Sequence, residues 1–317
     1  MSHIPRTWTA CVAALWLLVA CGCGVDHASL PRVAANNWAG YWPLYLAVRD
    51  APEPIAHLTE LHSATEVMRA YRNGAIDIAA LTLDEALVLA SEGPDVAVFL
   101  VVDLSAGGDA LVARADIATP AALAGRRIGL ESSALGAYML SRVYDRSELA
   151  PGAAEIVEIA YGDHARAFRR GEVDAVITFD PVRAELVAGG ARELFSSREI
   201  PGEIVDVLLA RPSYLEANRA AVARLVAAWQ AAVTHVRRSP ETAFARLDGF
   251  VAGDRARFDA ALAGIELPTP AQQRRLLRGE LAAVAERLTG VMRQHDLLGA
   301  SRGEFAITTA VFERALP

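Results

Sequence analysis

A short pattern of residues occurs twice in this chain, in the same order. The first copy reads AYRNGAIDIAALTLDE over residues 70–85, and the second reads AFRRGEVDAVITFDP over residues 167–181. Glycine tolerates the positive φ that ends a helix, the apolar run fits a buried strand, and Thr-x-Asp suits the start of the next helix. Coincidence is the alternative, because such junctions are common in α/β folds. Two related copies predict two similar lobes that face each other across a cleft.

Strand and helix signals alternate along the chain after Pro31, which is typical of sheets flanked by helices. Runs rich in apolar and β-branched residues predict strands at residues 32–35, 76–81, 96–103, 111–113, 127–130, 156–160, 175–178 and 205–210. Helical patterns occupy residues 133–146, 164–170, 181–188, 219–238 and 270–295. A further helix begins at Ser63, with Glu66 as its partner in a capping box. The sequence therefore predicts an α/β protein with parallel sheets.

The first residues have the layout of a secretory signal. Arg6 precedes an apolar run that is too short to span a bilayer comfortably and that ends in small residues. The end of this run, LVAC at residues 18–21, resembles a bacterial lipobox, in which the cysteine becomes the lipid-carrying first residue of the mature protein. An ordinary signal peptide that is cut nearby is the alternative. We expect a signal peptide at residues 1–20, a lipid on Cys21, a tether at residues 21–31, and an exported protein anchored at the periplasmic or cell-envelope face.

The amino-acid composition excludes several classes of function. The 317 residues include no lysine, so a P-loop lysine, a Schiff-base lysine for pyridoxal phosphate and Ser-Lys chemistry are absent. The formal charge of −7 argues against nucleic acid as a partner. All three cysteines lie in the leader, so the exported part has no disulfide framework and no thiol nucleophile. The sequence contains no histidines at metal-ligand spacing, no nucleophile elbow and no dinucleotide-binding fingerprint. We therefore expect no metal, no cofactor and no catalytic residue.

Five segments follow one another at a spacing that is specific when they are taken together. They read NNWAGYWPLYLA (36–47), RNGAIDIAAL (72–81), LAGRRIGLESSALGAYML (123–140), RGEVDAVITFDP (170–181) and SSREIPGEIVDVLLAR (196–211). In this order they resemble the periplasmic substrate-binding proteins of ABC importers, in the nitrate, sulfonate and taurine branch that also contains the thiamine-pyrimidine-precursor (NMT1-like) proteins. The resemblance extends from about residue 32 to about residue 240.

This resemblance implies a two-lobed, type II periplasmic-binding-protein (Venus-flytrap) fold, in which each lobe is a sheet flanked by helices. Lobe one would comprise residues 32–110 and 206–317, with the C-terminal helices in its second part, and lobe two would comprise residues 111–205. A monomer of this kind would close around a small solute and deliver it to an ABC permease and its ATPase, without any chemical step. Two alternatives are a binding protein of the same fold that serves a sensor or receptor, and an enzyme similar to the pyrimidine-precursor synthases. The absence of lysine opposes the second alternative.

The resemblance, together with the polar residues that follow strands, indicates a set of candidate ligand-binding residues. Trp38 and Tyr41 suit stacking on a planar or cationic solute, and packing at the rim of lobe one is the alternative for each. The polar residues bind ligand or only cap the following helix, and the alternative for Asp109 is a hinge turn. The complete set is Asn37, Trp38, Tyr41, Thr82, Asp109, Glu131, Ser132, Ser133, Thr178 and Asp180.

The candidate set contains three carboxylates and no basic side chain; the carboxylates are Asp109, Glu131 and Asp180. Carboxylates repel a bare anion, whereas an aromatic face beside carboxylates attracts a cation. We therefore predict an amine, an amidine or an aminopyrimidine-like ligand in preference to a simple oxyanion such as nitrate or a sulfonate.

Overall fold

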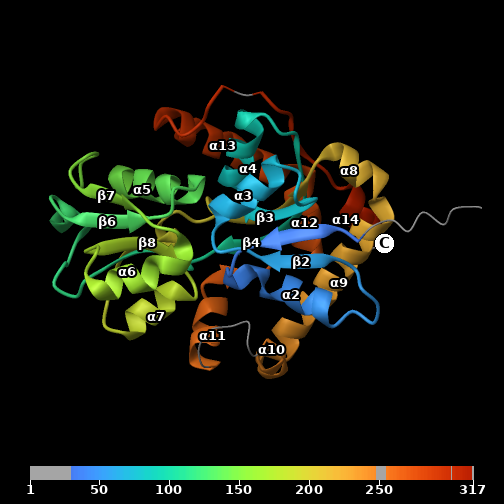
Figure 1. Cartoon of the computed structure of the whole chain (residues 1–317), viewed down its shortest axis with the longest axis horizontal. Helices are drawn as coiled ribbons and strands as arrows, with labels where there is room; N and C mark the ends of the chain where they lie inside the picture. Colours follow the sequence, from blue (N-terminus) through green and yellow to red (C-terminus); the bar gives the residue numbers. More distant parts are fainter. Residues whose placement is uncertain (1–29, 248–254, 301, 316–317) are drawn as a thin grey trace, which may run out of the picture.

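Two separate β-sheets, each flanked by helices, form the part of the chain that the structure describes (Figure 1). The structure is a computed structural model, and it describes residues 30–247, 255–300 and 302–315. The predicted signal peptide, Cys21 and most of the predicted tether lie outside these described residues. The prediction of an α/β fold with two sheets flanked by helices is confirmed.

The first sheet has seven strands, and we call the part of the chain built on it lobe one. The strand order is β11-β4-β10-β3-β1-β2, and β12 also pairs with β4. The strands are β1 (Arg32–Ala35), β2 (His57–Glu60), β3 (Ile78–Thr82), β4 (Val96–Ser105), β10 (Val205–Ala210), β11 (Ile265–Glu266) and β12 (Phe305–Ile307). Strand β1 is parallel to β2 and β3, whereas β10 lies antiparallel between β3 and β4.

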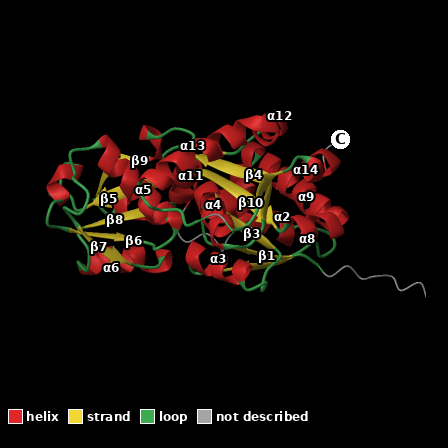
Figure 2. Ribbon diagram, turned by 90° about the horizontal axis from the view of Figure 1, so that it is seen from above, coloured by secondary structure: helices red, strands yellow, loops and turns green. Residues whose placement is uncertain are grey.

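The second sheet has five strands, and we call the part of the chain built on it lobe two. The order is β7-β6-β8-β5-β9, with β5 (Asp109–Ala113), β6 (Arg127–Leu130), β7 (Glu155–Glu158), β8 (Ala175–Phe179) and β9 (Arg192–Ser196). Strand β6 is parallel to β7 and β8, whereas β5 is antiparallel to β8 and β9. Figure 2 shows the two sheets side by side along the long axis of the molecule.

The prediction of parallel sheets is correct for the pairs that β1 makes with β2 and β3 and that β6 makes with β7 and β8. It is wrong for β5 and β10, which run against their neighbours. Parallel neighbours are joined by a crossover, usually a helix that packs on the same sheet. The chain instead enters β5 directly from β4 of the other lobe, and it enters β10 directly after the last strand of lobe two. The predicted lobe boundaries at 110/111 and 205/206 fall inside these two strands.

Helices cover both faces of each sheet (Figure 1). In lobe one, α3 (Ala64–Arg72), α4 (Leu83–Glu92) and α13 (Leu281–Gln294) lie on one side, and α2 (Trp42–Arg49), α9 (Arg219–Arg238) and α10 (Pro240–Arg246) lie on the other. Lobe one also contains α8 (Pro212–Ala217), α11 (Arg255–Leu262), α12 (Pro270–Arg275) and α14 (Ala310–Ala315). In lobe two, α5 (Ala134–Arg146) lies on one side of the sheet, and α6 (His164–Arg170) and α7 (Val182–Ala188) lie on the other.

Short helical turns complete the chain, and one of them divides a predicted helix. The 3₁₀ turns are η1 (Ala39–Tyr41), η2 (Pro120–Leu123), η3 (Tyr161–Asp163) and η4 (Ser197–Glu199). The helix predicted at 270–295 is interrupted by the π-helical segment η5 (Leu276–Glu280), in which Gly279 departs from helical geometry. No helix of the described ranges is long and apolar enough to cross a membrane.

The two glycines of the repeated pattern end helices, as the sequence predicts. Gly74 follows α3 with φ +68°, and Gly171 follows α6 with φ +73°, so both occupy the left-handed region that glycine adopts without strain. The copies differ after their strands. Thr82 is the N-cap of α4, whereas Thr178 lies inside β8 and Pro181 occupies the N-cap position of α7. At the start of α3, Ser63 accepts the predicted hydrogen bond from the Glu66 N–H, but the Glu66 carboxylate accepts from the N–H of His62.

Candidate ligand-binding cleft

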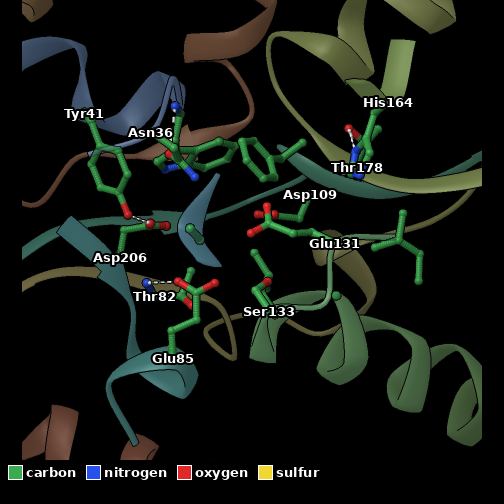
Figure 3. Close-up of a pocket in the computed structure, with 16 residues that line it drawn as sticks. Asn36, Tyr41, Thr82, Glu85, Asp109, Glu131, Ser133, His164, Thr178 and Asp206 are labelled. Carbon is green, nitrogen blue, oxygen red and sulfur yellow. Dashed lines mark hydrogen bonds between the residues drawn. The ribbon is translucent and has the colours of Figure 1, made fainter. Parts of the chain in front are cut away.

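A cleft lies between the two lobes, at the edges of the two sheets that face each other (Figure 3). The lining residues are Asn36, Trp38, Tyr41, Ala64, Thr82, Glu85, Asp109, Glu131, Ser133, Leu135, Gly136, His164, Ile177, Thr178, Phe179 and Asp206. Both lobes therefore contribute residues to the same site.

Strand direction explains how polar residues from distant parts of the chain meet here. The parallel strands β3 and β8 end at the cleft, at Thr82 and Phe179. Because β5 and β10 are antiparallel to these strands, they begin at the same edges. The register places Asp109 opposite Phe179 and Asp206 opposite Thr82. The two antiparallel strands therefore add a carboxylate to each side of the cleft.

Seven of the ten predicted residues line the cleft, namely Trp38, Tyr41, Thr82, Asp109, Glu131, Ser133 and Thr178. The structure does not bring the other three to it. Asn37 accepts a hydrogen bond from Trp42 Nε1 at 3.2 Å. Ser132 is exposed. Ligand contact by the seven lining residues stays a prediction.

Asp180 is buried, but its carboxylate is occupied by its own lobe. Arg183 donates to it through Nε and Nη2, with a shortest distance of 3.0 Å, and the N–H of Ala184 donates at 2.9 Å. The same arginine also pairs with Glu193 at 2.8 Å. Asp180 therefore anchors the start of α7, which is the capping role that the sequence left as its alternative.

An aromatic wall closes one side of the cleft. Trp38 Nε1 donates to Asp103 Oδ2 at 3.0 Å, and its ring meets the Phe179 ring edge-on at 5.5 Å. Phe179 stacks in turn on Tyr161 at 3.8 Å. Gly40 is required beside this wall, because a Cβ there would lie 1.7 Å from Asp103 Oδ2. These contacts join lobe one to lobe two and give the cleft a flat apolar face.

Tyr41 and Asp206 form a buried pair on the lobe-one side. The Tyr41 hydroxyl donates to Asp206 Oδ1 at 2.5 Å, as Figure 3 shows. Asp206 is 2% exposed, and burial, followed by repulsion from Asp103 and Asp109, raises the pKa of its carboxyl. This pair leaves one Asp206 oxygen that the tyrosine does not use.

Glu85 presents a carboxylate oxygen without a partner to the cleft. Its Oε2 accepts from the N–H of Thr82 at 3.0 Å and so completes the start of α4. Its Oε1 is buried and has no hydrogen-bond partner. Burial, with repulsion from Asp84 and Glu131, raises the pKa of Glu85 to about 8. A buried acceptor of this kind is costly unless a ligand supplies a donor.

Asp109 repeats this arrangement at the crossing between the lobes. Its Oδ2 is buried and unpartnered, and the side chain is 3% exposed. Burial raises the pKa of Asp109 to about 7. Its backbone N–H donates to Ser105 Oγ at 3.3 Å, and Gly107 N–H donates to Ser197 Oγ at 2.6 Å. Local hydrogen bonds thus hold the crossing while the Asp109 carboxylate stays available.

Glu131 and Ser133 occupy the start of α5 on the lobe-two side. Glu131 Oε1 accepts from the N–H and the hydroxyl of Thr65, at 2.7 and 2.8 Å. Ser133 is the N-cap of α5 and is 7% exposed, and its hydroxyl makes no hydrogen bond to another described residue. The amino end of a thirteen-residue helix, with a free hydroxyl beside it, therefore faces the cleft (Figure 3).

Positive charge is missing from this site. Of the described residues that line the cleft, none is an arginine. His164 lies between Thr178 Oγ1 and the carbonyl of Ile159, at 3.1 and 3.0 Å, and burial lowers its pKa to about 4. The imidazole is therefore neutral near pH 7. The described ranges also contain no group of three His, Cys, Asp or Glu residues placed to hold a metal ion.

Sequence reasoning missed four polar residues of the site, namely Asn36, Glu85, His164 and Asp206. Asp206 carried a usable signal, because a carboxylate inside the buried run VDVLLA is expensive unless it has a function. Glu85 was hidden by its role in a capping box, which accounts for a glutamate at that position without any ligand.

The comparisons with known proteins agree with the resemblance found in the sequence. A model of the NMT1-like family matches residues 51–246. The taurine-binding periplasmic protein of Escherichia coli (strain K12) is 26% identical over 158 residues, which cover 49% of each chain, so the chain spans about half the length of this curated relative.

Solved structures share the fold over most of the chain. The alkanesulfonate-binding protein SsuA from Xanthomonas axonopodis pv. citri, bound to MOPS, superposes with a TM-score of 0.74 at 16% identity, over 88% of this chain and 99% of that chain. The nitrate-binding protein NrtA from Synechocystis PCC 6803 superposes with a TM-score of 0.59 at 11% identity, over 74% and 68%. The predicted periplasmic-binding-protein fold and nitrate, sulfonate and taurine branch are confirmed, and the chain belongs to the NMT1-like family.

Proposed function

We propose that this protein is the solute-binding component of an ABC importer, and that it captures a small amine-bearing solute between its two lobes. The family supports the role, since its named relatives bind small solutes. The polar groups that line the cleft support an amine-bearing solute. The buried, unpartnered oxygens of Glu85 and Asp109 carry the proposal, because both need a donor that no neighbouring described residue supplies.

An ammonium group suits these oxygens better than any other common donor. One unit charge at 4 Å from a carboxylate gains about 4 kcal/mol at an effective dielectric constant of 20. Hydrogen bonds to charged groups contribute roughly 1.5–3 kcal/mol each. Once these carboxylates are ionised, above about pH 8, a simple oxyanion would meet the same energy as repulsion, and the neutral His164 offers no positive charge to offset it.

The carboxylates of Glu85 and Asp109 form one end of the site, which we call the amine pole. The start of α5, on the lobe that faces Glu85, forms a second pole that is rich in hydrogen-bond donors. Ser133 is buried and its hydroxyl is unpartnered, and the first N–H groups of a helix attract an acid group. A solute that carries an amine and an acid group at once fits both poles. Taurine is a molecule of this kind, and the relative of that name makes it the first solute to test. Planar amines, such as an aminopyrimidine, fit the carboxylates and the Trp38 face but leave the second pole empty.

Isothermal titration at pH 8 tests the proposal with three matched molecules. Ethanesulfonate lacks the amine of taurine, and ethylamine lacks the acid group. We expect taurine to bind more tightly than either, with at least about tenfold lost for each missing group. Nitrate and an aminopyrimidine complete the set. Ethanesulfonate or nitrate binding as tightly as taurine would contradict the amine pole, and a tighter aminopyrimidine would replace the zwitterion by a planar amine.

Anchoring and delivery belong to the same proposal. A lipid on Cys21 would hold the exported monomer at the membrane beside its permease and ATPase. Binding without chemistry is expected, because a closing cleft needs no nucleophile or general base. Nuclear magnetic resonance of taurine after prolonged incubation with the protein should show the unaltered molecule, and any new product would reopen the alternative of an enzyme.

A further inference from the structure

Glu131 differs from the other three carboxylates that line the cleft, because its partner belongs to the opposite lobe. Glu85 is bonded to Thr82 and Asp206 to Tyr41, both within lobe one. Glu131 follows β6 in lobe two, and its Oε1 accepts two hydrogen bonds from lobe one, both from Thr65. The hydrogen bonds of the Glu131 carboxylate therefore join lobe two to lobe one across the cleft.

The bond completes the amino end of a helix. Thr65 is the second residue of α3, so its N–H has no acceptor inside the helix. Ser63 satisfies the N–H of Glu66, and Glu131 satisfies that of Thr65 at 2.7 Å. The negative carboxylate also meets the positive end of the helix dipole. Lobe one thus supplies half of the cap of α3 and lobe two supplies the other half.

Buried hydrogen bonds also join the lobes at the crossing, where Ser105 Oγ lies 2.8 Å from Ser197 Oγ. Away from the crossing, burial separates the Glu131 contact from the ion pairs that His62 and His295 make between the lobes. Glu131 is 5% exposed, so water competes little for its bonds. The pair formed by His62 and Asp163 is 3.9 Å long, and its side chains are 52% and 41% exposed. The contact between His295 and Asp145 is 3.4 Å long and depends on protonation of the histidine. Exposed pairs of this kind contribute little.

We propose that Glu131 is the latch between the lobes, and that it sets how long the closed cleft retains its solute. The inference rests on the proposed function only for the solute, since the bond joins two protein groups. Glu131 then acts as a positioning residue for closure, whereas Glu85, Asp109 and Asp206 provide the charge that attracts the amine. In the open form the Thr65 N–H and the Glu131 carboxylate would both face water.

Stopped-flow measurements of taurine binding and release, followed by tryptophan fluorescence, test the latch. Glu131→Ala should accelerate release about tenfold and leave association unchanged. Thr65→Val, which removes the hydroxyl but keeps the N–H, should have a smaller effect in the same direction. The double variant should release taurine no faster than Glu131→Ala, because both changes break one interaction. Glu131→Gln, which keeps an acceptor oxygen, should recover part of the residence time.

Glu158→Gln is the matched control, because Glu158 is exposed at the end of β7, opposite Leu130 in the register. It removes one charge from the same lobe and should leave both rates unchanged. A Glu131→Ala variant that keeps the wild-type release rate would overturn the latch. So would additive effects of Glu131→Ala and Thr65→Val.

Amide hydrogen exchange separates the latch from the identity of the solute. The Thr65 amide should exchange faster in Glu131→Ala than in the wild type. If taurine fails to bind, the proposed solute is wrong, but this comparison still reports the bond. Equal exchange of the Thr65 amide in both proteins, with and without taurine, would overturn the latch whichever solute the cleft takes.

Discussion

Replacing Glu85 by glutamine is the sharpest test of the charge in the cleft. The substitution preserves the shape of the side chain, and its carbonyl oxygen can still accept from the Thr82 N–H, which Glu85 accepts at 3.0 Å. The start of α4 therefore stays capped. What the variant loses is the ability of Oε1, which is buried and unpartnered, to carry negative charge.

The size of the effect follows from two opposing energies. An ammonium group at 4 Å gains about 4 kcal/mol from a carboxylate at an effective dielectric constant of 20. The pKa of Glu85 is about 8, so ionising it at pH 7 costs about 1.4 kcal/mol. The difference of about 2.5 kcal/mol corresponds to a Kd for taurine that is roughly 30- to 100-fold higher in Glu85→Gln.

The pH dependence gives a second signature with a fixed sign. Below pH 8 the empty cleft holds a proton on Glu85, and an ammonium group must displace it. The affinity of the wild type should therefore rise as the pH rises from 6 to 8, and titrations in two buffers of different ionisation enthalpy should detect the released proton. In Glu85→Gln the rise between pH 7 and pH 8 should largely disappear, while Asp109, with a pKa of about 7, still contributes at lower pH.

Glu158→Gln again serves as the control, because this side chain is exposed and is not among those that line the cleft. An unchanged Kd in Glu85→Gln would refute the reasoning. An affinity for taurine that falls between pH 6 and pH 8 in the wild type would refute it as well, because the sign would then indicate an anion that binds the protonated cleft.

Three further outcomes are expected. The pKa of Glu85 rises from 4.5 to about 8 on folding, so the stability it contributes is complete below pH 4.5 and is lost as the pH rises through 8; the solute-free wild type should melt at a lower temperature at pH 8 than at pH 5. The corresponding loss of stability is at most about 5 kcal/mol. Glu85→Gln should reduce the difference in melting temperature, and an equal difference in both proteins would contradict the raised pKa of Glu85. Gly40→Ala should destabilise by about 1–3 kcal/mol in urea unfolding, because its Cβ would overlap Asp103, whereas the control Gly290→Ala, with open space at its Cβ, should be neutral or stabilising. Cys21→Ser should release the protein from the membrane fraction or stall its processing, and a processed, membrane-bound variant would rule out the lipid.

Local patterns in the sequence were sufficient for eight of the twelve strands of the described residues and for the kind of fold, but they did not predict β2, β9, β11 and β12. The strands β1, β6 and β10 have the predicted bounds, because short apolar runs between turn residues are a local signal. Gly74 and Gly171 end their helices for a reason that involves only their own backbone. The order of motifs along the chain then identified the family, since spacing survives where identity is low.

Which side chains face the cleft was decided by the tertiary structure. Tyr41 and Asp206 are 165 positions apart, and Thr65 and Glu131 are 66 apart, so no local pattern relates them. The antiparallel direction of β5 and β10 matters most. It brings the first residues of these strands, Asp109 and Asp206, to the edges where the parallel strands end.

The sequence alone indicated two lobes, most of their strands and a candidate site without basic side chains, because a repeated pattern, local apolar runs and residue types carry these signals along the chain. It could not determine the partner of a buried carboxylate. In strands buried on both faces, such as β10, the apolar run does not reveal which side chain meets a ligand and which meets the core. That choice depends on strand direction and on the opposite lobe, and both exist only once the chain is folded.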